Sequence, residues 1–459
     1  MSLTGLAFLF AYMAGIGAAF VRGPIWGLWT YMAVFYLHPP SRWWGVGLPP
    51  MRWALFAALV TLVALAVDRS RNQKQSSADD RKPFFSHGFA VFYAILVFWM
   101  WVQIPWVLSP NHMAGVVLFT KYLLMVYLFY SIVRTPKEIR DTLIVHIYGC
   151  MYLGWLAFNA KSGGRLEGVG GPGINDSNSM AMQFGTALLA GAGLMLREKW
   201  SQVAIIALPM PLILNGLLQG NSRGAYLAVF CSGVIFWWMK PGSVRGRFAT
   251  FAAVGACGFL VLAPSTFWDR IDTLRAVTNE EQQMDRSAES RFVIIAAQFR
   301  MLKDYPLGTG HKGTAELSPS YIEERYLTFS RANPEAGKAR SSHNTYMSVI
   351  VDHGVVGILL LLLILAWIYF TIRRARRRFR HTPRNALLLV AVTGSLAVVG
   401  FAGVFAPYMK AEVQFWMIAL LMSIVVLPKN DAPASGKADA DNPRDPVSPS
   451  RSQYRTAGN

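Results

Sequence analysis

The sequence predicts an all-α protein that crosses a membrane many times. The chain has 459 residues, of which 53% are hydrophobic and only 15% are charged. Its apolar residues gather in long runs, several of them close to the roughly 18 residues that a membrane span requires. Basic residues concentrate in alternate polar connections between these runs. Because lipid offers the backbone no hydrogen-bond partner, such spans are expected to be α-helices.

Thirteen apolar segments are candidates for spans: 3–20, 25–37, 51–67, 88–108, 113–133, 142–160, 179–196, 203–220, 225–239, 248–263, 347–370, 386–405 and 413–427. Segment 25–37 is short enough to be a tilted or re-entrant piece, which leaves twelve or thirteen spans. Segment 3–20 has the length of a signal peptide. It lacks a basic region before it, however, and another apolar segment follows at once, so we expect it to be retained.

The formal net charge of +19 is interpreted from where the charges lie. A strongly basic chain can bind nucleic acid, but in a membrane protein the basic loops indicate the cytoplasmic side. The densest basic block is 373–384, and the connections at 69–82, 134–140, 197–199 and 240–247 fall on the same side. We therefore expect no nucleic-acid partner, and we interpret the arginine block as a consequence of topology.

The chain divides into four predicted regions: an N-terminal transmembrane bundle (1–263), a polar subdomain (264–342), C-terminal transmembrane helices (343–427) and a disordered cytoplasmic tail (428–459). The polar subdomain is one long, mostly helical loop between the tenth and eleventh apolar segments, on the non-cytoplasmic side. Apolar residues three and four positions apart predict an amphipathic helix over 287–303. Proline and glycine then predict a turn at 306–313.

Four residues on the non-cytoplasmic side are the leading candidates for a site: Arg165, Arg223, Arg291 and His343. His343 lies at the water-facing start of the span 347–370, and histidine ordinarily titrates near neutral pH. The guanidinium group of arginine suits phosphate oxygens and keeps its charge when partly desolvated. The set predicts a diphosphate site with an acceptor hydroxyl beside it. His343 would remove the hydroxyl proton, and the arginines would stabilise the departing diphosphate.

Each candidate also has a structural interpretation. Arg165 fits an ordinary loop arginine, and Arg223 fits a side chain that reaches toward lipid headgroups. Arg291 fits an ion pair with an acidic residue of its own segment, such as Glu289. A single histidine is more often structural than catalytic, and spacing alone does not separate the two for His343.

Six further polar residues are predicted to support the site: Asn344, Tyr346, Asn175, Asn178, His311 and Lys312. The glycine-rich run 168–173 follows no strand and gives no nucleotide-binding signal. No Asp-rich motif that would hold a divalent metal occurs on this side, and the histidines lack zinc-site spacing. The three cysteines, at positions 150, 231 and 257, fall inside predicted spans and are expected to be buried structural thiols. We therefore expect chemistry without a metal or other cofactor.

Four elements in order resemble those of the O-antigen ligase and polymerase superfamily. They are RLEGVGGPGINDSN at 165–178, SRGA at 222–225, SR at 290–291 with DYPLGTG at 304–310, and HNTYMSVIVDHG at 343–354. One departure is that the superfamily often has Glu before the last glycine, whereas Asp352 and His353 precede Gly354 here, which leaves the role of position 352 open. The N-terminal third is similar to O-glycosylation ligases linked to exosortase systems.

The resemblance implies a GT-C-like glycosyltransferase of the bacterial inner membrane with a periplasmic active site. The implied donor is a glycan linked to undecaprenyl diphosphate, and the implied acceptor is a hydroxyl of the lipid A–core oligosaccharide. The implied transfer inverts the anomeric centre and needs no metal. Carried onto this chain, His343 is the general base, and Arg165, Arg223 and Arg291 bind the diphosphate.

Other functions use the same features. An O-antigen polymerase and a protein O-oligosaccharyltransferase share the implied donor and differ in the acceptor. A transporter or flippase for an anionic lipid would use the same arginines to bind its cargo. Transporters favour charged or broken spans near mid-membrane and internal repeats, whereas these spans are largely apolar and no convincing repeat is present.

Overall fold

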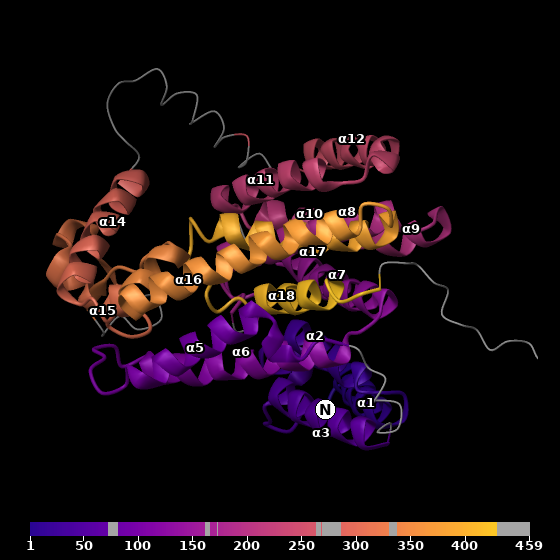
Figure 1. The fold of residues 1–459 in the computed structure, drawn as a ribbon, viewed down its shortest axis with the longest axis horizontal. Coiled ribbons are helices and arrows are strands. Elements are labelled where there is room, and N and C mark those ends of the chain that lie inside the picture. Colours follow the sequence, from indigo (N-terminus) through magenta and orange to yellow (C-terminus); the bar gives the residue numbers. More distant parts are fainter. Residues whose placement is uncertain are drawn as a thin grey trace, which may run out of the picture.

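The protein is described by a computed structural model covering residues 1–71, 81–160, 166–171, 173–262, 268, 286–329 and 337–428. Most of the long helices lie roughly along one direction, and α14 and α15 gather at one end of the molecule (Figure 1). The arginine at position 165 and the predicted disordered tail beyond 428 lie outside the described residues.

The α-helices are α1 (Leu3–Val21), α2 (Ile25–Leu37), α3 (Trp53–Arg71), α5 (Gly88–Val102), α6 (His112–Ile132), α7 (Pro136–Asn159), α8 (Ser177–Arg197), α9 (Trp200–Ala207), α10 (Met210–Gln219), α11 (Arg223–Met239), α12 (Arg245–Leu262), α14 (Arg286–Asp304), α15 (Gly313–Tyr321), α16 (Thr345–Arg378), α17 (Pro383–Ala402) and α18 (Glu412–Ile424). Short 3-10 turns are η1 (Pro39–Ser41), η2 (Trp43–Gly45), η3 (Phe84–Ser86), η4 (Gly242–Val244) and η5 (Glu324–Tyr326). The only strands in the described part of the chain are β1 (Thr328–Phe329) and β2 (Lys338–Ala339). They pair antiparallel, with Thr328 opposite Ala339.

The predicted all-α polytopic architecture is confirmed. Nine helical segments of the described chain are long and apolar enough to cross a membrane, and α5, α11 and α18 are shorter apolar helices. The number of spans, twelve or thirteen, stays a prediction, since α2 has only 13 residues. Segment 203–220 is divided into α9 and α10, because Pro209 and Pro211 have no N–H to donate within a continuous helix.

α8 and α17 pack along each other at the centre of the bundle. Small residues allow the close approach: a Cβ on Gly193 would lie 2.5 Å from that of Ala391, and one on Gly394 would lie 3.2 Å from that of Leu189. Such contacts hold membrane helices together by close packing, since lipid provides no hydrophobic drive between them.

A fully buried polar group joins α2, α7 and α8. The Tyr36 hydroxyl lies 2.5 Å from His146 Nδ1 and accepts from Gln183 Nε2 at 2.7 Å. His146 Nε2 lies 3.1 Å from Thr186 Oγ1, which donates to the Gln183 carbonyl at 2.6 Å. Because these groups satisfy one another, they act as a structural link between helices.

The cysteine prediction holds for one residue only. Cys150 is buried, Cys231 is half-buried and Cys257 is exposed. Cys257 lies on α12, a peripheral helix with no fully buried residue.

One end of the bundle, called here the basic end, carries the predicted cytoplasmic loops. Several arginines there bind carbonyls at the ends of neighbouring helices: Arg81 binds Val133 O, Arg247 binds Met195 O and Leu196 O, Arg376 binds Trp238 O, and Arg378 binds Val425 O and Leu427 O. Cations at helix C-termini complement the unpaired carbonyls and the helix dipole. Part of the positive charge of the chain therefore serves to bind the carbonyl ends of helices at the basic end.

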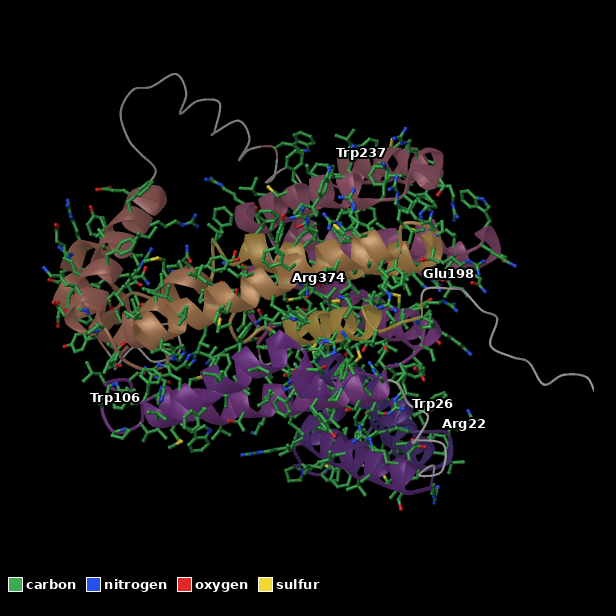
Figure 2. All side chains as sticks on the ribbon, viewed as in Figure 1. Arg22, Trp26, Trp106, Glu198, Trp237 and Arg374 are labelled. Atoms are coloured by element: carbon green, nitrogen blue, oxygen red, sulfur yellow. The ribbon has the colours of Figure 1, made fainter. Side chains whose placement is uncertain are left out.

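The opposite end, called here the site end, carries α14 and α15. Their small core consists of Ile294, Ala297, Met301, Leu317, Ile322 and Val351, and the last of these belongs to α16. The subdomain therefore packs on the first turns of α16. Figure 2 shows Trp106 at this end and Glu198 and Arg22 at the other.

Candidate functional site

His343 lies directly before α16 in a left-handed backbone conformation with φ of 50°. Its side chain is half-buried, and its Nε2 lies 3.4 Å from Ser341 Oγ. Asn344 caps α16: its side-chain oxygen accepts from the amides of Tyr346 and Met347 at 2.9 and 3.1 Å. Residues other than glycine adopt this conformation rarely, and often at functional sites. Asn344 thus fixes the backbone from which the imidazole projects.

α16 is interrupted at Gly354, whose φ of 61° and ψ of −154° are not helical. The turn at 306–310 supplies hydrogen-bond partners to the backbone groups of α16 around this interruption. The amide of Val355 donates to Pro306 O at 2.9 Å, and the amide of Thr309 donates to Val351 O at 3.0 Å. The amide of Gly310 donates to Asp352 O at 2.9 Å. The predicted turn after α14 is therefore locked into the helix that follows His343.

α5 completes this junction. Gln103 Nε2 donates to Asp352 O at 3.1 Å, while Gln103 Oε1 lies 2.9 Å from His353 Nδ1. Trp99 Nε1 donates to His353 O at 3.1 Å. α5 ends before Gln103, short of the predicted segment 88–108, because residues beyond it turn toward the broken helix. All carbonyls freed by the break at 351–353 therefore have partners, as backbone within a membrane bundle requires.

The connection between α17 and α18, residues 403–411, packs against the start of α16. The amide of Thr345 donates to Gly403 O, and its hydroxyl donates to Ala406 O, both at 2.7 Å. The same hydroxyl accepts from the amide of Tyr408 at 2.8 Å. The Tyr346 hydroxyl donates to a carbonyl of α17 at 2.7 Å. Tyr346 thus anchors the helix that carries the site.

Phe405, within this connection, lies beside Arg291 and beside the start of α11, which begins at Arg223. The guanidinium carbon of Arg291 lies 5.7 Å from the centre of the Phe405 ring. Gly224, next to Arg223, approaches so closely that a Cβ would lie 2.7 Å from that of Phe405. Both arginine side chains are exposed, and Arg291 makes no hydrogen bond or ion pair with a described residue. The alternative of an ion pair with Glu289 finds no support among the described residues, and the Glu289 carboxylate accepts from a tyrosine hydroxyl at 2.5 Å.

Arg340 adds a cation that the sequence did not single out. It is half-buried, three residues before His343, and its Nη2 lies 3.3 Å from Ser290 Oγ. Its amide donates to Ser318 Oγ at 2.8 Å. Burial, followed by the charge of Arg291, lowers the pKa of Arg340. Its place in the motif was visible in the sequence, but only folding shows that it turns toward Arg291.

Arg165 lies outside the described residues, but the loop after it is anchored. Arg42 Nη1 donates to Val169 O at 2.9 Å, and Gly171 packs on the ring of His38. Burial lowers the pKa of Arg42. Burial, followed by the charge of Arg42, lowers the pKa of His38. Neither Arg42 nor His38 was predicted to shape the site.

Asn175 and Asn178 lie at the start of α8. Asn175 is exposed, and its carbonyl accepts from the amide of Gly168 at 2.9 Å. Asn178 is half-buried, and its amide donates to the side chain of Asp176, the N-cap of α8, at 3.1 Å. These backbone contacts shape the loop that follows position 165.

His311 and Lys312 form the turn that leads into α15. The carboxylate of Asp352 accepts from the amides of Lys312 and Gly313 at 3.0 and 2.9 Å, and lies 3.6 Å from His311 Nδ1. His311 is buried, while the Lys312 side chain is exposed. Burial, followed by the charge of Lys312, lowers the pKa of Lys410 in the 403–411 connection. The role left open for position 352 is therefore filled by holding this turn.

A cavity of about 1360 Å³ extends from the start of α16 to the basic end. At the site end its walls include Thr345, Tyr346 and Tyr408. Its middle is apolar, between α16 on one side and residues of α5, α11, α17 and α18 on the other. At the basic end its walls include Lys240, Arg373, Arg376, Arg377 and Arg380. We call it the groove.

The site end thus combines a histidine with a group of arginines, Arg223, Arg291 and Arg340, called here the arginine cluster. Such a cluster suits an anion with several oxygens, and the histidine suits proton transfer at a neighbouring hydroxyl. Within the described ranges, no group of three or more His, Cys, Asp or Glu is placed to hold a metal ion.

The fold defines a polytopic helical membrane protein, and one end of its bundle carries a histidine and several arginines. Residues 208–362 match the family model described as O-Antigen ligase, and this segment contains the arginine cluster and His343. This match supports an assignment to the O-antigen ligase family, whose members are glycosyl-transferring enzymes acting on lipid-linked glycans. No curated protein matches the chain. The similarity of the N-terminal third to exosortase-linked ligases stays a prediction.

Proposed function

We propose that the chain is a ligase of the bacterial inner membrane with its active site facing the periplasm. It transfers a glycan from undecaprenyl diphosphate to a hydroxyl of the lipid A–core oligosaccharide. The observation that supports the proposal is that Arg291 and Arg340 lie together next to the residues that hold His343, and that α11 begins at Arg223 beside Phe405; the three arginines and His343 belong to the segment matched by the family.

In the proposed reaction, His343 takes the proton of the acceptor hydroxyl as its oxygen attacks the anomeric carbon of the donor. The bond from that carbon to the phosphate oxygen breaks, and undecaprenyl diphosphate leaves with the electron pair. The attack comes from the face opposite the leaving group, which inverts the anomeric centre. The arginine cluster stabilises the charge that grows on the diphosphate, and Arg165 completes this group in the proposal.

The groove supports a lipid-linked donor. Its walls at the site end include Thr345 and Tyr346, two and three residues after His343, and its body is apolar. A polyprenyl chain that enters there keeps its methylenes away from water while its diphosphate stays at the arginine cluster.

The test uses the purified protein in liposomes with undecaprenyl-diphosphate-linked glycan and three acceptors: lipid A–core, a second donor molecule and an acceptor protein. Glycan on lipid A–core is expected, and His343→Ala is expected to abolish transfer while donor binding remains. His381→Ala, which removes an exposed imidazole at the basic end, is the control and should transfer normally. Normal turnover by His343→Ala would exclude His343 as the base.

The same assay separates the rival activities. Lengthening of the lipid-linked glycan identifies a polymerase, and glycan on the acceptor protein identifies a protein O-oligosaccharyltransferase. Movement of donor between leaflets without transfer to any acceptor identifies a transporter. Activity is expected to survive EDTA, and a loss that magnesium restores would refute the metal-free mechanism.

The diphosphate role is tested with Arg291→Lys. A lysine keeps the charge but not the planar pair of donors, so we expect weaker donor binding. Arg325→Lys is the matched control, because Arg325 is exposed on the same subdomain and pairs with Glu323 at 2.8 Å. Equal donor affinities for the two variants would contradict the assignment of Arg291.

A further inference from the structure

The face of α16 that lines the groove changes character along its length. The apolar residues that line it recur at helical spacing: Leu361, Ile364, Leu365, Ile368, Tyr369 and Ile372. The same stripe continues as Arg373, Arg376, Arg377 and, just past the helix end, Arg380. One side of the helix is therefore apolar through the middle of the bundle and cationic where the groove reaches the basic end.

Topology explains why arginines follow a span, but it does not explain which of them line a cavity. Arg376 is used structurally, since it donates to Trp238 O at 2.9 Å and lies over that ring at 4.0 Å. Arg373, Arg377 and Arg380 are exposed, and in the part of the chain that the structure describes they have no hydrogen-bond or ion-pair partner. They border the groove with their donors unused.

The opposite wall has the same sign of charge. Lys240, at the end of α11, lines the groove mouth, and its Nζ lies 3.5 Å from the centre of the Trp237 ring. None of the described residues that line the groove is acidic. Five cations, including Arg376, thus line this end of the groove without an acidic residue among the lining residues, so an anion bound there would be electrostatically favoured.

We propose that the basic end of the groove binds an anionic glycerophospholipid of the cytoplasmic leaflet. Its phosphate lies among Arg373, Arg377 and Arg380, and its acyl chains lie against the apolar stripe of α16. The charge complementarity and the continuity of apolar and cationic walls fit an amphiphile with a negative headgroup, because a basic pocket between membrane helices suits such headgroups. The site lies at the opposite end of α16 from His343 and goes beyond the proposed transfer reaction.

The experiment compares two variants that each remove two charges from the same basic block. Arg373→Gln/Arg377→Gln alters the groove mouth, whereas Arg374→Gln/Arg384→Gln alters exposed residues that do not line the groove. Phosphatidylglycerol or phosphatidylcholine is titrated into each detergent-solubilised full-length protein. Bound lipid is counted by native mass spectrometry, and the melting temperature is followed in parallel.

Wild-type protein and the Arg374/Arg384 variant are expected to retain phosphatidylglycerol and to melt at higher temperature in its presence. The Arg373/Arg377 variant is expected to bind it roughly 30-fold more weakly, the combined effect of two cations near a lipid headgroup. Phosphatidylcholine and inorganic phosphate should give no shift. Equal binding by the two variants, or an equal response to phosphatidylcholine, would overturn the proposal.

A second variant tests the apolar wall with the charges intact. Ile368→Trp places a larger side chain in the groove and is expected to weaken retention of phosphatidylglycerol while leaving Arg373 and Arg377 in place. Unchanged retention would contradict the placement of the acyl chains. His343→Ala is expected to bind phosphatidylglycerol like the wild type. Failure of the lipid site and failure of the transfer reaction are therefore observed separately.

Discussion

Replacement of Gly354 by alanine tests whether the break in α16 positions the site. A Cβ there would lie 2.1 Å from Pro306 O and 2.6 Å from the amide nitrogen of Gly308. Both are backbone atoms, so no side-chain rotation relieves the contact. The backbone itself, with φ of 61° and ψ of −154°, occupies a region that is almost exclusive to glycine.

The expected loss of stability follows from the hydrogen bonds that the turn would lose and from the backbone strain. The three backbone hydrogen bonds between the turn and α16 contribute about 1 kcal/mol each, and they are lost if the turn retreats. The strained conformation adds about 1 to 3 kcal/mol for a residue with a Cβ. Gly354→Ala is therefore expected to lower the free energy of unfolding by about 4 to 6 kcal/mol, which places it among the most damaging single substitutions.

Thermal unfolding in detergent, followed by tryptophan fluorescence, measures this loss, and glycan transfer reports whether His343 stays in place. Gly233→Ala on α11 is the matched control, because no heavy atom lies within 4 Å of its added Cβ. That variant should melt like the wild type or gain about 0.5 to 1 kcal/mol, as alanine does in a helix interior. Wild-type melting and transfer by Gly354→Ala would refute the argument that the inserted turn holds the site.

Three further predictions concern Asn344, Asp352 and His38. Asn344→Ala removes the N-cap of α16 and should cost about 1 kcal/mol of stability, while Asn344→Ser should recover most of it; equal melting of both would contradict the capping role. Asp352→Asn should speed hydrogen exchange of the Lys312 amide, since an amide donor replaces one accepting oxygen. Unchanged exchange would show that the Asp352 carboxylate does not hold this turn. Burial, followed by the charge of Arg42, lowers the pKa of His38 in the folded protein below its ordinary value of 6.5. Its contribution is therefore full above pH 6.5 and lost as the pH falls through the depressed pKa, so His38→Gln should flatten the decline of melting temperature on acidification.

Much of the site was visible in the sequence because it lies in short motifs. His343 and Asn344 adjoin an apolar span, and Arg291 begins an amphipathic helix whose predicted range, 287–303, agrees closely with α14. Arg340 was harder to identify, because one arginine among many shows no sign of which partner it will face. Its contact with Ser290 and its closeness to Arg291 arise from two segments separated by 50 residues in the chain.

The structure also assigns specific contacts to residues for which the sequence indicated only a polar side chain. Asn344 caps α16, Tyr346 ties it to α17, and Asp352 holds the turn at Lys312. Their side chains act on the backbone, which a motif does not reveal. The alternative of an ion pair between Arg291 and Glu289 finds no support among the described residues, and Glu289 accepts from a tyrosine hydroxyl.

By itself the sequence determined that the protein is a helical membrane bundle, because burying apolar runs in lipid leaves the backbone few other structures. It also determined which loops carry the positive charge. Only the tertiary structure decided that α16 is broken where a distant turn enters it, and that one face of the same helix lines a groove from Thr345 to the basic end. Both depend on contacts between segments far apart in the chain, and local patterns of hydrophobicity do not encode these.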